Sequence, residues 1–343
     1  MTESEDESVK RYAAYIKPYL SAFLLAPLLM LTEVFGEILL PKFMSMIINN
    51  GVADRDTGYI IRTGIIMVLT AIVMAAGGIG GAYFSAKASI CFTSDLRDAL
   101  FAKVQNFSFK NIDQYSTGSL VTRLTNDVQQ VQNVTMMGLR LLFRAPGMLI
   151  GALIMAFLMN AKLALVILIV IPFLSIAIVT IMVKAFPRFT LMQKKIDKLN
   201  SGIQEALTNV RVIKSFVRED YEEEKFQTMN QDLKDSSLNA MKIVIATMPI
   251  MMFAMNVTTL AVVWYGGNII IAGNMQVGEM IAFITYTMQI VMSFLMLAMV
   301  AVMLPRAGVA ADRIDEVCRT KASIHDPDAA TAKPALEKKD WDG

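Results

Sequence analysis

The charged residues with the most informative spacing are two pairs that stand inside apolar segments. Glu33 and Glu37 lie four residues apart in one segment, and Arg140 and Arg144 lie four residues apart in another. Positions i and i+4 share one face of a helix, and charge in an apolar environment is costly unless it is paired. At ~1.5 Å per residue from the outer ends of the two segments, Glu33 and Arg144 fall at similar depth, roughly 25 Å down. We predict a Glu33–Arg144 contact, which either locks two helices together or binds substrate directly.

Other residue types that carry chemistry are sparse. The two cysteines, Cys91 and Cys318, are far apart in sequence, and the single histidine, His325, has no partner for catalysis beside it. This spacing indicates neither a disulfide nor a metal cluster. The 343 residues also contain no Gly-x-x-x-x-Gly-Lys-Ser/Thr loop to cradle phosphates. We therefore expect no catalytic residue, no metal and no cofactor in this chain.

Long apolar helices must position these residues. The chain is 55% hydrophobic and only 18% charged, and a helix of about 20 apolar residues crosses the hydrocarbon core of a bilayer. Four uncharged stretches are long enough to span it, at residues 64–86, 163–183, 243–278 and 280–305. Two shorter blocks, 18–32 and 145–161, become full spans if the side of the helix that faces protein hides the charged residues that flank them. Because lipid offers the backbone no hydrogen-bond partners, we expect six spans and all of them helical.

Basic residues are distributed unevenly between the two sides of the predicted membrane. With a cytoplasmic N-terminus, the three exterior loops hold only Arg55 and Lys162, whereas the interior segments 87–132 and 184–242 hold a large share of the Lys and Arg. Such an excess marks cytoplasmic loops. We therefore predict a multi-pass integral membrane protein with both termini in the cytoplasm.

The two interior segments keep helical spacing and are too long for simple loops. In the first, apolar residues recur at three- to four-residue intervals between Phe92 and Phe107. At ~1.5 Å per residue this continuation of the second span reaches ~30 Å beyond the membrane. The second segment repeats the design, with residues 184–208 running outward and 221–242 returning. Each segment is predicted to form a long helical hairpin with a turn at its tip.

The tips of these hairpins carry distinctive strings. Residues 109–127 read Phe-Lys-Asn-Ile-Asp-Gln-Tyr-Ser-Thr-Gly-Ser-Leu-Val-Thr-Arg-Leu-Thr-Asn-Asp, where we expect Asp113 to cap a short helix and Gly118 to supply the reversal. Residues 209–220 read Asn-Val-Arg-Val-Ile-Lys-Ser-Phe-Val-Arg-Glu-Asp, and Arg-Ile-Asp-Glu at 313–316 closes the sixth span. With six spans in the matching order, these strings resemble the transmembrane domain of type IV ABC exporters, the multidrug and lipid exporter group, over essentially the whole chain.

The resemblance implies an all-α membrane protein with six transmembrane helices, long cytoplasmic extensions and the type IV ABC exporter fold. It implies coupling helices near 111–118 and 210–216 that dock on ATP-binding domains, the second one on the partner subunit's domain through a crossover of spans four and five. The first would comprise Asn111, Ile112, Asp113, Gln114, Tyr115, Ser116, Thr117 and Gly118, and the second Val210, Arg211, Val212, Ile213, Lys214, Ser215 and Phe216.

The same resemblance implies the domain organisation and partners. Residues 1–19 would form a tail and an amphipathic elbow helix, 20–320 the six-helix domain, and 321–343 a linker toward an ATP-binding domain that these residues do not contain. ATP and Mg²⁺ would bind in that domain, so the chain is one part of an ATP-coupled translocase in a bacterial plasma (inner) membrane. Residues 65–98 and 136–156 look most like one half of heterodimeric exporters, which favours a different half-transporter as partner over a second copy. We expect no nucleic acid.

Methionines form stripes on the last two spans, where flexible thioethers suit a surface that accepts varied apolar cargo. Core packing or lipid contact is the alternative meaning of such a stripe. The possible substrate pathway comprises Met252, Asn256, Tyr286, Gln289, Met292, Met296 and Met299. The competing functions are an ATP-independent channel or secondary transporter, and a membrane scaffold or receptor. A secondary transporter would more often show inverted repeats with short loops on both sides, which is the opposite of this pattern.

Overall fold

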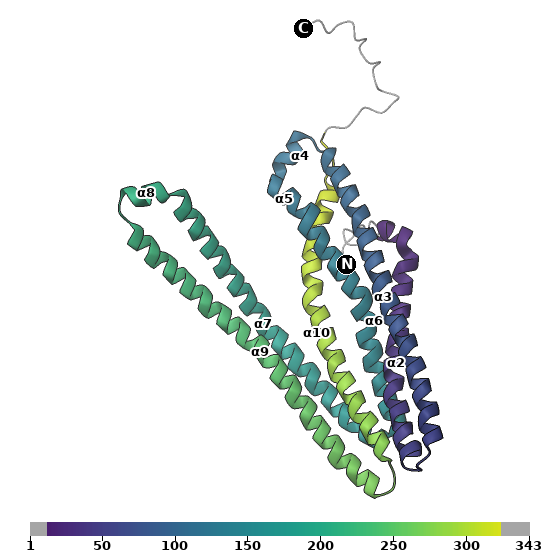
Figure 1. The fold of residues 1–343 in the computed structure, drawn as a ribbon. Coiled ribbons are helices and arrows are strands. Elements are labelled where there is room, and N and C mark those ends of the chain that lie inside the picture. Colours follow the sequence, from purple (N-terminus) through teal and green to yellow (C-terminus); the bar gives the residue numbers. More distant parts are fainter. Residues whose placement is uncertain (1–11, 324–343) are drawn as a thin grey trace, which may run out of the picture. The chain divides into compact units, whose positions relative to one another are not determined.

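A computed structural model describes residues 12–323, and the elements of this part of the chain are all helical (Figure 1). Residues 12–16 are helical, and the chain then continues through η1 (Lys17–Tyr19), α2 (Leu20–Met46), η2 (Ile47–Val52), α3 (Thr57–Gln105), α4 (Phe109–Gln114), α5 (Thr117–Thr122), η3 (Arg123–Asp127), α6 (Val128–Met159), α7 (Ala161–Thr208), α8 (Val210–Ser215), α9 (Glu219–Ile271) and α10 (Val277–Arg319). Residues 1–11 of the predicted tail, most of the predicted linker and His325 lie outside the described residues.

Six helical stretches are long and apolar enough to cross a bilayer, which confirms the predicted six-span, all-α fold. Between the third and fourth spans, Asn160 alone joins α6 to α7, and its side chain accepts a hydrogen bond from Leu163 N at 3.1 Å. The loop between the fifth and sixth spans is short, because α9 continues to Ile271 and leaves only residues 272–276 before α10. Gly273 makes this short turn possible with a φ of +73°.

The contacts divide the chain into two compact units. Within the described residues, unit one contains 12–31, Gly77–Phe143 and 299–323, and unit two contains Thr32–Ala76 and Arg144–Ala298. In unit one, the apolar stripe predicted on the second span is buried, with Phe92, Leu96 and Leu100 inside the core. The spacing of this stripe therefore reports the face that α3 packs against the rest of unit one.

The start of the described chain is fastened to unit one. The Tyr12 hydroxyl donates to the Ala311 carbonyl oxygen at 3.0 Å, and the Tyr19 hydroxyl donates to Asp95 at the same distance. Pro18 lies at the start of η1, where its missing N–H costs no helical hydrogen bond. Residues 12–19 thus form a helical segment packed on unit one.

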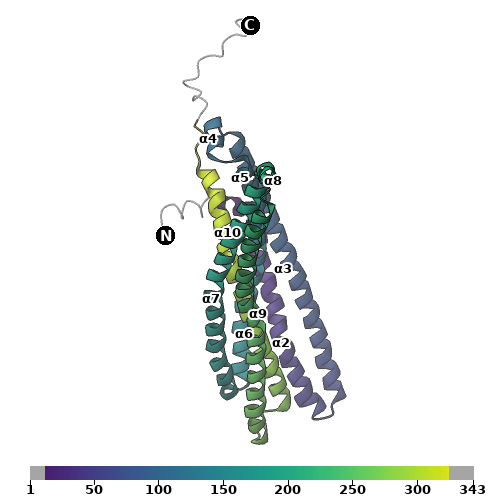
Figure 2. The same cartoon turned by 90° about the vertical axis from the view of Figure 1, so that its left-hand side faces the viewer.

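Unit two contains the longest helical hairpin. Helices α7 and α9 lie side by side, and α8 joins them at the tip, which the rotated view in Figure 2 also shows. The 53 residues of α9 correspond to about 80 Å at 1.5 Å per residue, whereas the hydrocarbon core is only about 30 Å thick. A large part of this hairpin therefore extends beyond the membrane.

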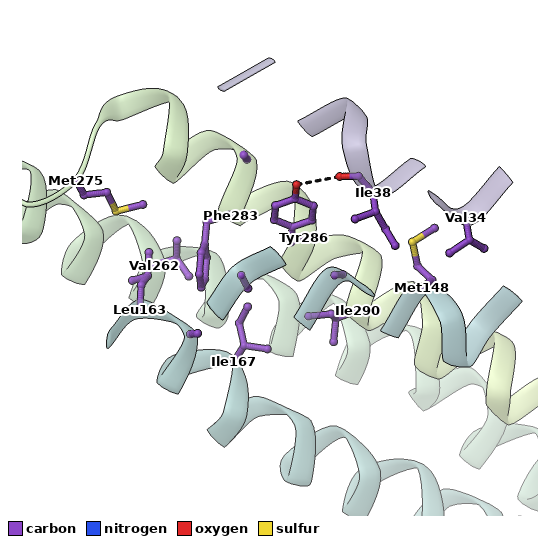
Figure 3. Close-up of a cluster of buried hydrophobic side chains, with 14 residues drawn as sticks. Val34, Ile38, Met148, Leu163, Ile167, Val262, Met275, Phe283, Tyr286 and Ile290 are labelled. Carbon is purple, nitrogen blue, oxygen red and sulfur yellow. Dashed lines mark hydrogen bonds between the residues drawn. The ribbon is translucent and has the colours of Figure 1, made fainter. Parts of the chain in front are cut away.

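The core of unit two gathers apolar side chains from α2, α6, α7, α9 and α10 (Figure 3). Phe283 and Tyr286 are fully buried in it, and the Tyr286 hydroxyl points to Ile38 and donates to its carbonyl oxygen at 2.9 Å. A buried phenol needs such a partner, because an unpaired hydroxyl in an apolar core is costly. Tyr286 thereby joins α10 to α2.

Candidate functional site

The first hairpin tip begins with a capping box. Ser108 Oγ accepts from Asn111 N at 3.4 Å, and Asn111 Oδ1 accepts in return from Ser108 N at 3.4 Å and Ser108 Oγ at 2.8 Å. Asn111 takes the place that Glu or Gln usually fills in this motif. The prediction that Asp113 caps the helix is wrong, because Asp113 lies inside α4. The Ser-x-x-Asn spacing was the available signal for the true cap.

The reversal at the first tip does not use Gly118. The chain turns through Tyr115 and Ser116, whose backbones are extended with ψ of 135° and 147°. Gly118 lies inside α5, while Gly273 is the one glycine with positive φ among residues 12–323. Ser116 caps α5 instead, because its Oγ accepts from Ser119 N at 3.2 Å. The predicted glycine turn is therefore corrected to two extended residues between two capped helices.

The first tip has an outer and an inner face. Asn111 is buried, Ile112 and Tyr115 are half-buried, and Asp113 and Gln114 are exposed. The residues of the turn and of early α5 that were assigned to the coupling helix, Ser116, Thr117 and Gly118, are exposed as well. Phe109, which the sequence assignment left out, is 86% exposed. Phe109 therefore projects from the outer face of the tip.

The second tip is almost entirely exposed. Of the predicted residues, Ile213 is half-buried, and those exposed are Val210, Arg211, Val212, Lys214, Ser215 and Phe216. Val217 follows with a left-handed φ of +52°, which a β-branched residue adopts only when its surroundings impose it. Arg218 N donates to the Ile213 carbonyl oxygen at 3.0 Å, and Lys214 Nζ pairs with Glu219 at 2.9 Å. These bonds fix a turn that presents Phe216 and Val217 to solvent.

The base of the first tip is fastened to the end of α10 by charged side chains. Arg313 binds the buried Asp127 through two hydrogen bonds, Nε to Oδ2 at 2.8 Å and Nη2 to Oδ1 at 2.5 Å. Arg123 donates to the Arg313 carbonyl oxygen at 3.1 Å, pairs with Glu316 at 2.8 Å and lies 4.8 Å above the Tyr115 ring. Hydrogen bonding to Asp127 raises the pKa of the Arg313 guanidinium, which stays charged. The strings at 123–127 and 313–316 thus meet in one network.

We predict that Asp127→Asn lowers the free energy of unfolding by about 1–2 kcal/mol, because the neutral amide offers the charged Arg313 one acceptor instead of two and sets its NH2 donor against the guanidinium. Asp98→Asn is the matched control, since Asp98 is exposed and makes no ion pair within the described residues. Denaturant unfolding in detergent, followed by intrinsic fluorescence, measures both variants. Equal stabilities of the two variants would show that the Asp127–Arg313 pair does not stabilise the fold.

The charge cluster in unit two involves three side chains. Arg144 Nη1 pairs with Glu33, and Nη2 pairs with Glu37 Oε2 at 3.0 Å. The structure thus has the contact predicted between Glu33 and Arg144, and it adds Glu37 to the same guanidinium. Arg140 does not join them: it lies in unit one, is exposed and forms no ion pair with any residue in 12–323. Gln289 Nε2 donates to the Glu37 carbonyl oxygen at 3.0 Å, which ties α10 to the same turn of α2.

The residues predicted to line a substrate pathway separate into two groups. Tyr286 and Gln289 hold α10 against α2, whereas Met252, Asn256 and Met292 in unit two are exposed. Asn256 donates to the Met252 carbonyl oxygen of its own helix at 2.8 Å. In addition, Met296 is half-buried in unit two, and Met299 is exposed in unit one. The pathway assignment stays a prediction.

Unit two also contains a contact between the end of α2 and the start of α10 that the sequence did not indicate. The α2 helix widens into the π-helical η2, and Asn49 in this segment accepts a hydrogen bond from Gly278 N at 2.8 Å. A β-carbon on Gly278 would lie 2.6 Å from the Ser45 carbonyl oxygen and 2.5 Å from Asn49 Oδ1. Only glycine lets α10 begin this close to α2.

Comparisons with known proteins agree with this architecture. The model of the family described as ABC transporter transmembrane region matches residues 23–294. An uncharacterized ABC transporter ATP-binding protein of Bacillus subtilis (strain 168) is 33% identical over 313 residues, which cover 91% of this chain and 55% of that protein. Another from Mycobacterium tuberculosis (strain ATCC 25618 / H37Rv) is 35% identical over 314 residues, 92% of this chain and 54% of that protein. The chain spans about half the length of the curated relatives it matches.

Proposed function

Because the chain belongs to the family of ABC transporter transmembrane regions, we propose that it couples ATP hydrolysis in ATP-binding domains to the export of a substrate. Membership of this family makes the chain a multi-pass membrane domain of an ABC transporter. The observation that carries the finer proposal is the pair of helical hairpins whose tips expose Phe109, Phe216 and Val217. A stiff helical lever with a shaped tip transmits a domain movement over tens of ångströms, which a flexible loop does not do.

The motor in this proposal is an ATP-binding domain, where ATP and Mg²⁺ bind. The matched relatives are named ATP-binding proteins, and the match covers only 55% and 54% of their length, which supports such a domain as partner. The first tip, α4, docks on one domain, and the second, α8, docks on the domain of the partner subunit after spans four and five cross over. A different half-transporter completes the pathway as the favoured heterodimer.

The docking surface proposed for the first tip is its outer face. Asn111 is buried and Tyr115 is half-buried, so the side chains that reach a partner are Phe109, Asp113 and Gln114. For the second tip they are Val212, Lys214 and Phe216, together with the projecting Val217. Aromatic side chains that enter a pocket usually dominate the binding energy of an interface. Phe109 and Phe216 are therefore assigned as the two anchors.

The proposal places the chain in a bacterial plasma (inner) membrane with both termini in the cytoplasm. The excess of Lys and Arg in the two hairpin segments supports this orientation. The cargo proposed is a hydrophobic small molecule, because exposed methionines such as Met252, Met292 and Met299 offer a deformable apolar surface. Alternating access then carries the cargo outward while the tips move with the ATP-binding domains.

We predict that Phe109→Ala combined with Phe216→Ala weakens the affinity for the ATP-binding domains by at least about tenfold, the usual effect of losing interface anchors. Phe101→Ala is the control, because Phe101 is an exposed aromatic of α3 that lies outside both tips. Fluorescence titration of the detergent-solubilised chain with labelled domain measures the dissociation constants. Unchanged affinity in the double variant, with normal thermal unfolding, would overturn the assignment of the tips.

A further inference from the structure

The chain that leaves α10 lies against the first tip helix. Asn111 Nδ2 donates to the Lys321 carbonyl oxygen at 3.1 Å, and Asn111 Oδ1 accepts from Ser323 N at 2.9 Å. One amide group therefore binds two backbone groups of the same short segment. A two-point contact of this kind fixes position and orientation together, much as a pair of ladder bonds does in a sheet.

Two further contacts reinforce this arrangement. The hydroxyls of Tyr115 and Thr320 are hydrogen-bonded at 2.7 Å, and Ser108 is bonded to Ser323 through their hydroxyls. Two neighbours hold the Tyr115 ring, since it stacks on Phe107 with centroids 6.3 Å apart and lies 4.8 Å from the Arg123 guanidinium. The segment 320–323 thus meets a preorganised surface on the tip.

The burial of Asn111 requires an explanation beyond the capping of α4. The side chain is only 5% exposed, although it belongs to a short polar helix at the end of a hairpin. A capping role uses one acceptor, toward Ser108. One donor and the remaining acceptor capacity of the amide are used by the segment after α10, and a buried amide is stable only when such partners are present.

We propose that Asn111 is a positioning residue that clasps segment 320–323 to the first tip helix, so that the tip and the chain leaving α10 move as one body. The mechanical consequence rests on the proposed function: a movement of the docked ATP-binding domain reaches α10 through the clasp as well as through α5 and η3. The network of Asp127 and Arg313 holds the helix itself, and the clasp extends that connection past the last helical residue.

The clasp is tested without nucleotide, so its failure is distinguishable from failure of the transport proposal. Endoproteinase Lys-C cuts after Lys321 inside the clasp and after Lys214 at the second tip, which serves as the internal reference. In the detergent-solubilised chain we expect slow cutting at Lys321, because proteolysis requires local opening. Asn111→Ala should accelerate this cut by about tenfold relative to Lys214, since both hydrogen bonds from its side chain to segment 320–323 are lost.

Two further variants separate the clasp from a general loosening of the tip. Asn111→Asp keeps the acceptor toward Ser108 and Ser323 but loses the donor to Lys321, so an intermediate rate is expected. Ser116→Ala removes the cap of α5 without touching segment 320–323, and its rate at Lys321 should stay within about twofold of the parent chain. Rapid cutting at Lys321 in the parent chain, no change in Asn111→Ala, or equal acceleration by Ser116→Ala would overturn the proposal.

Discussion

Arg144→Glu is expected to lower the free energy of unfolding by about 3 kcal/mol, the lower end of the usual cost of removing one partner from a buried ion pair, because this cluster is only partly buried. Arg144 is the only cation among the described residues that pairs with Glu33 and Glu37, and the side chains of the three residues are 22%, 17% and 32% exposed. The substitution places three carboxylates where one guanidinium held two. Loss of the folded fraction in detergent, measured by denaturant unfolding, is the readout.

Restoring the charges in exchanged positions should recover part of this loss. The double variant Arg144→Glu with Glu33→Arg again has one cation and two carboxylates in the cluster, so we expect it to be more stable than the single variant. Arg140→Glu is the matched control, because Arg140 lies one turn earlier on α6, is exposed and makes no ion pair in the described part of the chain. A double variant no more stable than Arg144→Glu would show that the ion pair between Glu33 and Arg144 does not stabilise the chain.

Gly278→Ala is expected to lower the free energy of unfolding by about 3 kcal/mol, the upper end of the usual range for overpacking. The added methyl group would lie 2.6 Å from the Ser45 carbonyl oxygen, and a backbone atom within a helix moves less readily than a side chain. The bond from Gly278 N to Asn49 would lengthen or break as the helices separate. The same detergent unfolding assay measures this variant.

Gly267→Ala is the comparison for Gly278→Ala. Gly267 lies inside α9, and a β-carbon there would meet no atom within 4 Å. Alanine in a helix interior is favoured over glycine by about 0.5–1 kcal/mol, so this variant should be slightly more stable than the parent. Equal effects of the two substitutions would show that α2 and α10 can separate at no cost.

Much of the fold could be predicted from the sequence because it depends on burial and periodicity. Uninterrupted apolar blocks define the spans, and the stripe that begins at Phe92 marks the buried face of α3. The Glu33–Arg144 contact could be predicted because an unpaired charge inside a membrane span is costly, and because the two residues lie at similar depth when residues are counted from the ends of their helices. These arguments need only helix geometry and the hydrophobic effect.

Details of the tips could not be predicted in this way. Serine, asparagine and aspartate all compete for backbone donors at a helix start, so sequence alone favoured Asp113 although Ser108 is the cap. Gly118 suggested a left-handed turn, but two extended residues, Tyr115 and Ser116, reverse the chain instead. The contact of Asn111 with the segment after α10 depends on Lys321 and Ser323, which lie more than 200 positions away in the chain. The close approach at Gly278 likewise depends on a distant partner, Ser45.

The measurement that tests the central claim most directly is dye movement in sealed membrane vesicles that contain the chain assembled with its ATP-binding domains. A panel of fluorescent apolar compounds is followed with ATP and Mg²⁺, with ADP, and with an imposed ion gradient in the absence of nucleotide. The account predicts movement with ATP and Mg²⁺ alone, and its loss in the Phe109→Ala, Phe216→Ala double variant. Movement that continues without nucleotide and follows the ion gradient would contradict it and would identify a secondary transporter.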